Sequence, residues 1–213
     1  MSSSAAAPAA VDAVVFDIGG VLVDANYRHL YRKLIDDESA MEEFLATVCT
    51  QEWHTRHDAG YPMEQGVAEL VAQYPQHAAL ISAWHKRFDE TWAGAIEETV
   101  VIAADLKSAG IPLYLLSNWP GEVYPMAQQR FPFLEDHFAG QVISGYEGVT
   151  KPDPRIFEIL TDRYGLVPAS TVFIDDTEHN AVAAARLGFQ AIRFTGAAHL
   201  RQDLIARGLP LKA

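Results

Sequence analysis

The sequence contains one cysteine, Cys49, in 213 residues. A single cysteine excludes a disulfide framework within the chain and a zinc site built from several cysteines. Cys49 lies among apolar residues at helical spacing, which favours packing in a core over a reactive thiol. Positive charge is also scarce, with 16 Lys and Arg against 28 Asp and Glu and a formal net charge of -12. We therefore expect no nucleic-acid partner, and any anionic ligand needs a local cationic site.

Long hydrophobic runs are missing as well. The apolar stretch after the opening MSSSAAAPAA is interrupted by Asp12 and Asp17, and no basic segment precedes it. This pattern is untypical of a signal peptide or a membrane span, so we expect a soluble, cytoplasmic protein without a membrane partner. Residues 1–10, rich in Ser and Ala, are expected to form a disordered tail. No heptad or internal repeat is visible, and the oligomeric state is left open.

Short apolar segments recur along the rest of the chain, in which 49% of the residues are hydrophobic. Five of them read as buried strands, at residues 13–16, 112–116, 142–144, 172–174 and 191–194. Helical patterns separate these segments, which is typical of an α/β fold with a doubly wound parallel sheet. We predict a Rossmann-like core formed by residues 11–25 and 97–213.

Between residues 26 and 96 the apolar residues take up helical spacing instead. Four stripes follow the i, i+3, i+4, i+7 pattern or a close variant: Tyr27, Leu30, Tyr31 and Leu34; Met41, Phe44, Leu45 and Val48; Val67, Leu70, Val71 and Tyr74; Ile81, Trp84, Phe88 and Trp92. Such stripes can be buried only against one another, which predicts a helical-bundle cap inserted after the first strand. The cap would overhang the carboxyl edge of the sheet, where open α/β sheets bind ligands.

Reactive side chains follow four of the predicted strands or segments. They stand in FDIGGVLVD, LLSNW, TKPDP and FIDDTEHN, and the reactive residues are Asp17, Ser117, Asn118, Lys151, Asp175 and Asp176. The ends of parallel strands meet at one edge of the sheet, so these groups are expected to converge. Together with the inserted cap, this constellation resembles the haloacid dehalogenase superfamily over nearly the whole chain.

The resemblance implies a magnesium-dependent phosphatase that forms a phospho-aspartate on Asp17. It places Mg²⁺ between the carboxylates of Asp17 and Asp176 and the backbone carbonyl of Gly19, and the ion suits these oxygen ligands. Ser117 and Lys151 would bind the phosphoryl group. Asp175 is left open between supporting the metal and capping a helix, and Asn180 would orient Lys151 or a metal-bound water.

Gly19 departs from the family pattern. Most phosphatases of this superfamily carry a second aspartate there, which protonates the leaving alcohol and later activates water. We expect a leaving group that needs little protonation, or an acid supplied by the cap. The segment EWHTRHDAG offers Glu52, His54, His57 and Asp58 as candidates for substrate binding, against the alternative of a polar loop or exposed helix turn. Gly19→Asp is expected either to raise turnover of alkyl phosphates or to fail through crowding.

The first and second motifs are similar to those of bacterial α-glucose-1-phosphate phosphatases, so a sugar phosphate is the favoured substrate among small phosphorylated metabolites. Asn118 and Trp119 would contact it, although packing between core and cap is an equal alternative for Trp119. A metal-independent 2-haloacid dehalogenase is the second hypothesis, disfavoured by the acidic pair Asp175 and Asp176. A binding module without catalysis is the third.

Overall fold

The computed structural model describes residues 10–212, so the tail predicted for residues 1–10 lies almost wholly outside the described residues. A five-stranded parallel sheet forms the centre of the protein, in the order β5-β4-β1-β6-β7. Its strands are β1 (Ala13–Phe16), β4 (Leu113–Ser117), β5 (Gly140–Ile143), β6 (Thr171–Asp175) and β7 (Gln190–Arg193). All five predicted strands are present; β1 has the predicted ends, the ends of the other four differ by at most two residues, and the predicted α/β class is confirmed.

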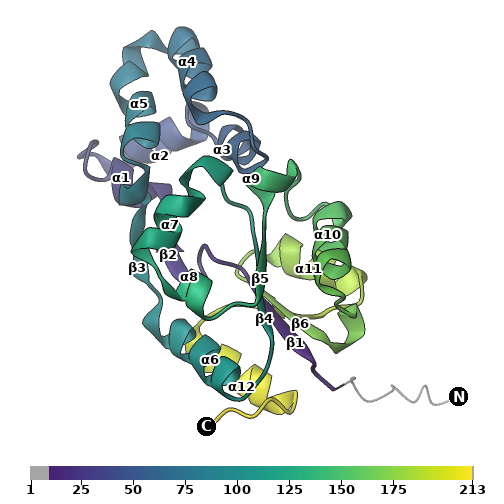
Figure 1. Ribbon diagram of the computed structural model, residues 1–213. Coiled ribbons are helices and arrows are strands. Elements are labelled where there is room, and N and C mark those ends of the chain that lie inside the picture. Colours follow the sequence, from purple (N-terminus) through teal and green to yellow (C-terminus); the bar gives the residue numbers. More distant parts are fainter. Residues whose placement is uncertain (1–9, 213) are drawn as a thin grey trace, which may run out of the picture.

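Helices cover both faces of this sheet (Figure 1). They are α6 (Glu97–Ser108), α7 (Tyr124–Arg130), α8 (Phe133–Asp136), α9 (Ser144–Glu147), α10 (Pro154–Tyr164), α11 (Glu178–Arg186) and α12 (Ala197–Ala206). Side chains alternate along β1: Val15 packs with α10 and α11, whereas Val14 and Phe16 belong to the core that includes α6 and α12. Both faces are buried, which explains why β1 reads as a continuous apolar run.

The cap is built from five helices that stand above the carboxyl edge of the sheet (Figure 1). They are α1 (Tyr27–Tyr31), α2 (Glu38–Thr47), α3 (Gln51–Asp58), α4 (Met63–Gln73) and α5 (Ala78–Lys86). Trp84 and Tyr31 are fully buried at its centre. Cys49 is buried beside the Tyr31 hydroxyl, and burial raises the pKa of its thiol to about 12, as expected of a packing residue.

One prediction for the cap is wrong in detail. The stripe from Ile81 to Trp92 does not form one helix, because α5 ends at Lys86 and a 3₁₀ helix, η2 (Phe88–Thr91), follows. Trp92 instead begins β3 (Trp92–Ala95), which pairs antiparallel with β2 (Val23–Ala25). The hydrogen-bonding partner of β3 lies about 70 residues earlier, so no local pattern reveals it. These two strands connect the core to both ends of the cap.

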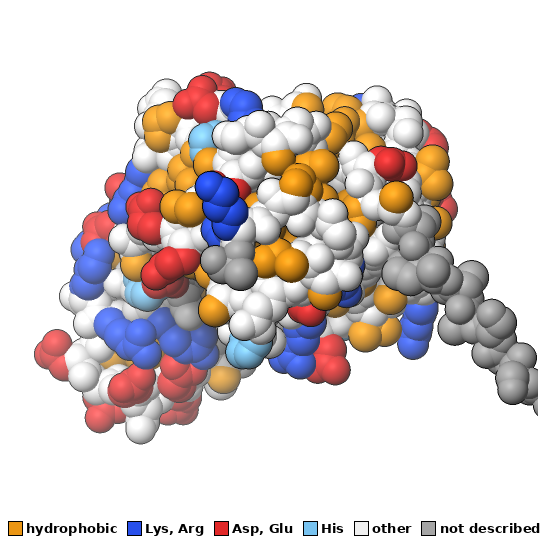
Figure 2. All heavy atoms as spheres, turned by 90° about the horizontal axis from the view of Figure 1, so that it is seen from below, with side chains coloured by type: hydrophobic (Ala, Val, Ile, Leu, Met, Phe, Trp, Pro, Cys, Tyr) orange, Lys and Arg blue, Asp and Glu red, His pale blue; other side chains and the backbone are white. Residues whose placement is uncertain are grey.

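The remaining short helices are η1 (Pro75–His77), η3 (Gly121–Val123) and η4 (Pro168–Ser170). Figure 2 shows the molecule from below, where Lys and Arg side chains lie beside Asp and Glu side chains. Within the coloured part of that view, neither sign of charge forms a broad patch of its own. Among residues 10–212, no helix has both the length and the apolar character needed to cross a bilayer.

Candidate active site

Three neighbouring strands bring the predicted site residues together. Phe16, the last residue of β1, pairs with Leu115 of β4 and Ile174 of β6. The chain therefore delivers Asp17, Ser117 and Asp175 to the same edge of the sheet, one from each strand end. Ser117 donates a hydrogen bond of 2.7 Å to Oδ1 of Asp17. The convergence predicted from the motifs is present in the fold.

Lys151 is buried beneath these residues, with 2% of its surface exposed. Its ammonium group lies 2.6 Å from Asp175 Oδ2, 3.0 Å from Asp17 Oδ2 and 2.9 Å from the carbonyl oxygen of Leu116. Burial alone would lower the pKa of Lys151, but the two carboxylates outweigh it and hold the pKa above its ordinary value. The ammonium is therefore a permanent positive charge beside Asp17.

Asp17 is held by hydrogen bonds at one oxygen and by charge at the other. Oδ1 accepts from Ser117 and from the backbone N–H of Ile18, at 2.7 Å each, and Oδ2 faces Lys151. Burial raises the pKa of Asp17 to about 7; the Lys151 ammonium opposes this shift, and the Asp175 carboxylate adds to it. One cation therefore does not neutralise the carboxylates of this site.

The surplus negative charge is suited to a divalent cation. Carboxylate oxygens of Asp17, Asp175 and Asp176 lie within 4.8 Å of one another. Burial, together with repulsion from Asp175, raises the pKa of Asp176. Oxygen donors of this kind are the ligands that Mg²⁺ prefers, so the residues fit the metal that the sequence suggests.

The three carboxylates are not equally free to bind a cation. Asp175 is fully buried and accepts from Lys151, from the Thr177 N–H at 2.8 Å and from Asn180 Nδ2 at 3.1 and 3.2 Å. Asp176 is exposed at the rim and accepts a 3.2 Å bond from the Thr177 hydroxyl. Asn180 thus contacts Asp175, the carboxylate that also accepts from Lys151, so it reaches Lys151 through Asp175; its alternative role toward a metal-bound water stays a prediction.

Gly19 and Gly20 shape the turn beneath Asp176. A Cβ at Gly19 would meet Ala25 and the Trp119 ring, both at 3.8 Å, so a Cβ itself is not crowded at this position. Gly20 has φ +72°, and a Cβ there would lie 2.3 Å from Asp176 Oδ2. The tight position is therefore Gly20.

Asn118 holds the loop that carries Lys151. Its side-chain amide donates to the Lys151 carbonyl at 2.9 Å, and its Oδ1 accepts from the Lys151 N–H at 2.8 Å. Both polar atoms of the Asn118 side chain are thus used within the protein. Asn118 also lines the cavity described below, so the predicted contact with substrate stays a prediction.

A cavity of about 760 Å³ lies between these core residues and the cap. Its cap side includes Tyr27 of α1 and one face of α3, formed by Gln51, Thr55 and Asp58. These three α3 residues lie at i, i+4 and i+7, a spacing that the sequence contains but that apolar periodicity does not detect. Gln51, Thr55 and Tyr27 are site residues that the sequence analysis missed.

Of the four cap candidates in EWHTRHDAG, the structure brings only Asp58 to the cavity. Glu52 is exposed, on another side of α3. His54 is buried and stacks on Tyr27, with ring centroids 3.7 Å apart, and His57 is buried with Nδ1 2.9 Å from the Tyr61 carbonyl oxygen. Burial lowers the pKa of His54 to about 3, so its ring is neutral. The segment is thus neither a polar loop nor a set of four substrate contacts.

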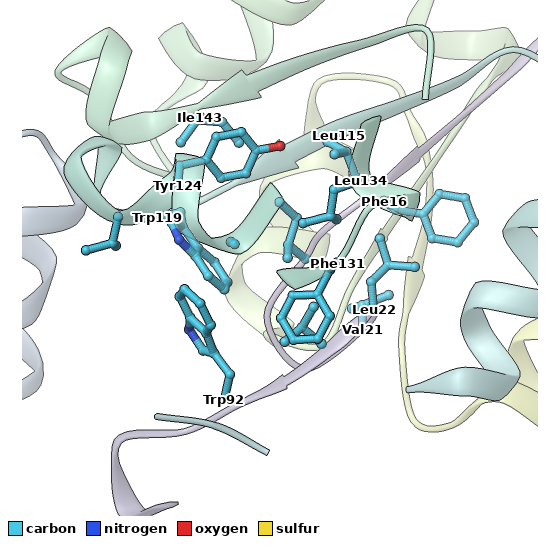
Figure 3. Close-up of a cluster of buried hydrophobic side chains, with 14 of the residues drawn as sticks. Phe16, Val21, Leu22, Trp92, Leu115, Trp119, Tyr124, Phe131, Leu134 and Ile143 are labelled. Atoms are coloured by element: carbon cyan, nitrogen blue, oxygen red, sulfur yellow. The ribbon is translucent and has the colours of Figure 1, made fainter. Parts of the chain in front are cut away.

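Trp119 is buried against Trp92, and their ring centroids lie 5.5 Å apart (Figure 3). Trp92 belongs to β3 and Trp119 to the loop after β4, so this contact joins the core to the base of the cap. Both residues also line the cavity. Packing between core and cap, one of the two roles considered for Trp119, is present.

Comparison with known proteins supports the same chemistry. The family model of the haloacid dehalogenase-like hydrolases matches residues 11–188. The chain is 22% identical to a sesquiterpene phosphatase of Aspergillus oryzae over 184 residues, 86% of this chain and 89% of that protein. It is 25% identical to the D-ribitol-5-phosphate phosphatase of Bacteroides thetaiotaomicron over 201 residues, 90% of this chain and 95% of that protein.

A solved structure shares the fold. It is a HAD family enzyme of Bacteroides thetaiotaomicron in complex with magnesium and inorganic phosphate. It superimposes with a TM-score of 0.67 at 21% sequence identity, covering 89% of this chain and 98% of that chain. At this identity the likeness describes the arrangement of helices and strands, and the chemistry has to be argued from the residues of this chain.

Proposed function

Because this chain belongs to the haloacid dehalogenase-like hydrolases, we propose that it cleaves small phosphate monoesters through a phospho-aspartate on Asp17. It is a phosphatase that acts on phosphorylated substrates, as its relatives of similar length are. The observation that carries the proposal is the environment of Asp17, which lies between Ser117 and the buried Lys151 at the wall of the cavity. This arrangement suits a carboxylate that must meet an anionic phosphoryl group.

Each core residue has a role that follows from its contacts. Asp17 Oδ2 attacks phosphorus, and the bond from phosphorus to the leaving oxygen breaks. Lys151 stabilises the negative charge on the phosphoryl oxygens, and Ser117 holds the carboxylate in position through Oδ1. Asp175 keeps the ammonium in place, since it accepts the 2.6 Å bond from Lys151. Water then cleaves the phospho-aspartate and restores Asp17.

Mg²⁺ would be held by Asp17, Asp176 and the carbonyl of Gly19. When bound, the ion neutralises the negative charge shared by the carboxylates and the phosphate. Asp175 would support this site from beneath, because its oxygens already accept hydrogen bonds from Lys151, Thr177 and Asn180.

The cavity lining favours a phosphorylated sugar or polyol as the substrate. Polar groups of Gln51 and Thr55 line the cap side, and the rings of Tyr27, Trp92 and Trp119 line the same space. Hydroxyl groups of a sugar can form hydrogen bonds with Gln51 and Thr55, and its C–H face can pack on the aromatic rings. The relative that acts on D-ribitol 5-phosphate is in keeping with this class.

Phosphate release from a panel of sugar and polyol phosphates, with magnesium and with a chelator, tests the proposal. We expect magnesium-dependent release that Asp17→Asn abolishes, a loss of at least about 10³-fold. Chloride release from 2-chloropropionate in the presence of the chelator would instead identify a dehalogenase. Equal release by the wild type and Asp17→Asn would identify a binding module.

A further inference from the structure

The site described above lacks a proton donor for the leaving group. Gly19 has no side chain, and Lys151 is engaged with Asp17 and Asp175. An alkoxide leaves poorly without a proton, and general acid catalysis is typically worth about 10² to 10⁴ in rate. An enzyme that cleaves sugar or polyol phosphates therefore needs an acid from elsewhere in the cavity.

Asp58 is the buried carboxyl group on the cap side of that cavity. It is the last residue of α3, and 7% of its surface is exposed. No hydrogen bond from the residues that the structure describes reaches its carboxylate, although its backbone carbonyl accepts one. The carboxyl group is thus free to exchange a proton with a ligand or with water in the cavity.

Two other titratable groups around the cavity, Arg28 and His179, are engaged or exposed. Arg28 forms a two-bond ion pair with Glu42, at 2.5 and 2.6 Å. His179 is exposed on α11, on the core side. Asp58 differs from both, because it is buried at the cap side of the cavity and no described residue donates a hydrogen bond to its carboxylate.

The core fixes the position of Asp58. The hydroxyl of Ser144, at the start of α9, donates to the Asp58 carbonyl and accepts a 2.9 Å bond from the Trp119 N–H. Nearby, Gly60 packs closely on Gly145, since a Cβ on Gly60 would lie 2.7 Å from the Gly145 carbonyl oxygen. The end of α3 is therefore docked on the same core loops that form the site.

We propose that Asp58 is the general acid and base of the reaction and takes over the task that an aspartate at position 19 would perform. The inference rests on the proposed phosphatase function. In the first step, Asp17 bonds to phosphorus while the Asp58 carboxyl gives its proton to the leaving oxygen, which departs as a neutral alcohol. In the second, the Asp58 carboxylate takes a proton from the water that attacks phosphorus, and the bond from phosphorus to the Asp17 oxygen breaks. Inorganic phosphate is released, and both aspartates are restored.

The electrostatic surroundings of Asp58 agree with this role. Burial raises the pKa of Asp58 to about 7, and the Lys151 ammonium opposes the shift. On the cap side Asp58 faces Tyr27, whose pKa burial and the Asp58 charge raise well above its ordinary value, so that residue stays neutral. An acid with a pKa close to the working pH can both give and take a proton.

Asp58→Asn tests the assignment with two substrates of different leaving group. An alkyl phosphate, such as glycerol 3-phosphate or the best substrate of the panel, needs the proton; p-nitrophenyl phosphate does not, because its leaving anion is stable. We expect kcat for the alkyl phosphate to fall by about 10² to 10⁴ and kcat for p-nitrophenyl phosphate to fall by less than about tenfold. In the wild type, kcat/KM for the alkyl phosphate should fall as pH rises through about 7, and Asp58→Asn should lose this limb.

Two further variants make the result specific. Glu52→Gln removes a carboxylate from the exposed side of the same helix and should leave both activities unchanged. Gly19→Asp in the Asp58→Asn background should restore alkyl phosphate turnover, since a Cβ at Gly19 meets no atom closer than 3.8 Å. Turnover of p-nitrophenyl phosphate also reports whether the variant is folded. Equal losses on the two substrates in Asp58→Asn would overturn the inference about Asp58 but not the proposed phosphatase function. Loss of the proposed function itself would appear separately, as wild-type activity no higher than that of Asp17→Asn.

Discussion

Gly19 and Gly20 are adjacent in the turn after β1, yet the structure constrains them differently. Gly20 is in the left-handed region, which costs an ordinary residue about 1–2 kcal/mol, and a Cβ there would lie 2.3 Å from Asp176 Oδ2. Gly19 has neither constraint. The two positions therefore form a matched pair for testing the placement of Asp176.

We predict that Gly20→Ala displaces the Asp176 carboxylate and lowers the affinity for magnesium by about 10- to 100-fold, the range seen when supporting contacts of metal ligands are lost. Gly19→Ala keeps the backbone carbonyl and adds only contacts of 3.8 Å, so its loss should be smaller. Phosphate release titrated with magnesium, with circular dichroism to check folding, measures both. Equal weakening in the two variants would contradict the assignment of Asp176.

The residues of the site could be predicted where a motif places them at a strand end. Asp17, Ser117, Lys151 and Asp175 meet because parallel strands end at one edge, which the order of motifs already implies. Side-chain partners could not be predicted in the same way. Asn118 and its loop illustrate this, since the bonds to Lys151 depend on the path of a segment 33 residues away.

Helix α9 links the core to the cap through one hydroxyl group. Ser144 is fully buried, and its hydroxyl satisfies both the Asp58 carbonyl and the Trp119 N–H. Leaving a buried polar group without a partner costs about 1–3 kcal/mol. The hydroxyl thus contributes both to stability and to the position of the proposed acid.

We predict that Ser144→Ala lowers Tm by about 2–4 °C for each kcal/mol lost, as expected for a domain of this size. It should also lower kcat for an alkyl phosphate more than kcat for p-nitrophenyl phosphate, because Asp58 is no longer held. Differential scanning fluorimetry and the two assays measure this. Ser170→Ala serves as the control, since its hydroxyl makes only a long 3.4 Å bond to Val167. A loss of stability with an equal loss on both substrates would limit Ser144 to a structural role.

At the level of elements, the pairing between strands far apart in the sequence could not be predicted. The five core strands are marked by local apolar runs and were found. The β2–β3 pair joins two short segments across the whole cap, and Trp92 was assigned to a helix because its spacing from Trp84 and Phe88 fits a helical stripe. The sequence leaves the segment of α3 open between substrate contacts and a polar loop or exposed helix turn, because its cavity face is polar and its buried face contains histidines.

Charge balance connects the site to the stability of the whole molecule. Burial raises the pKa of Asp17 from 3.8 to about 7, so between these values the folded protein binds a proton that the unfolded chain does not. This contribution makes the protein less stable as pH rises through that window. Buried His54, with its pKa lowered from 6.5 to about 3, contributes the opposite slope. The stability of the metal-free protein alone therefore does not isolate the carboxylates of the site, whereas the increment caused by magnesium reports on the carboxylates that bind it.

Magnesium binds the ionised carboxylates of the folded state, so it should raise Tm more at pH 8 than at pH 5, where a proton competes for Asp17. At a concentration about 100 times the dissociation constant, binding adds about 2.7 kcal/mol, which corresponds to about 5–10 °C. Thermal melts with magnesium and with a chelator at the two pH values measure the increment. Asp176→Asn should abolish it, whereas Glu178→Gln, which changes an exposed carboxylate paired with Arg193, should keep it. An increment that is equal at both pH values, or that survives in Asp176→Asn, would place the bound ion elsewhere than at the carboxylates of Asp17 and Asp176.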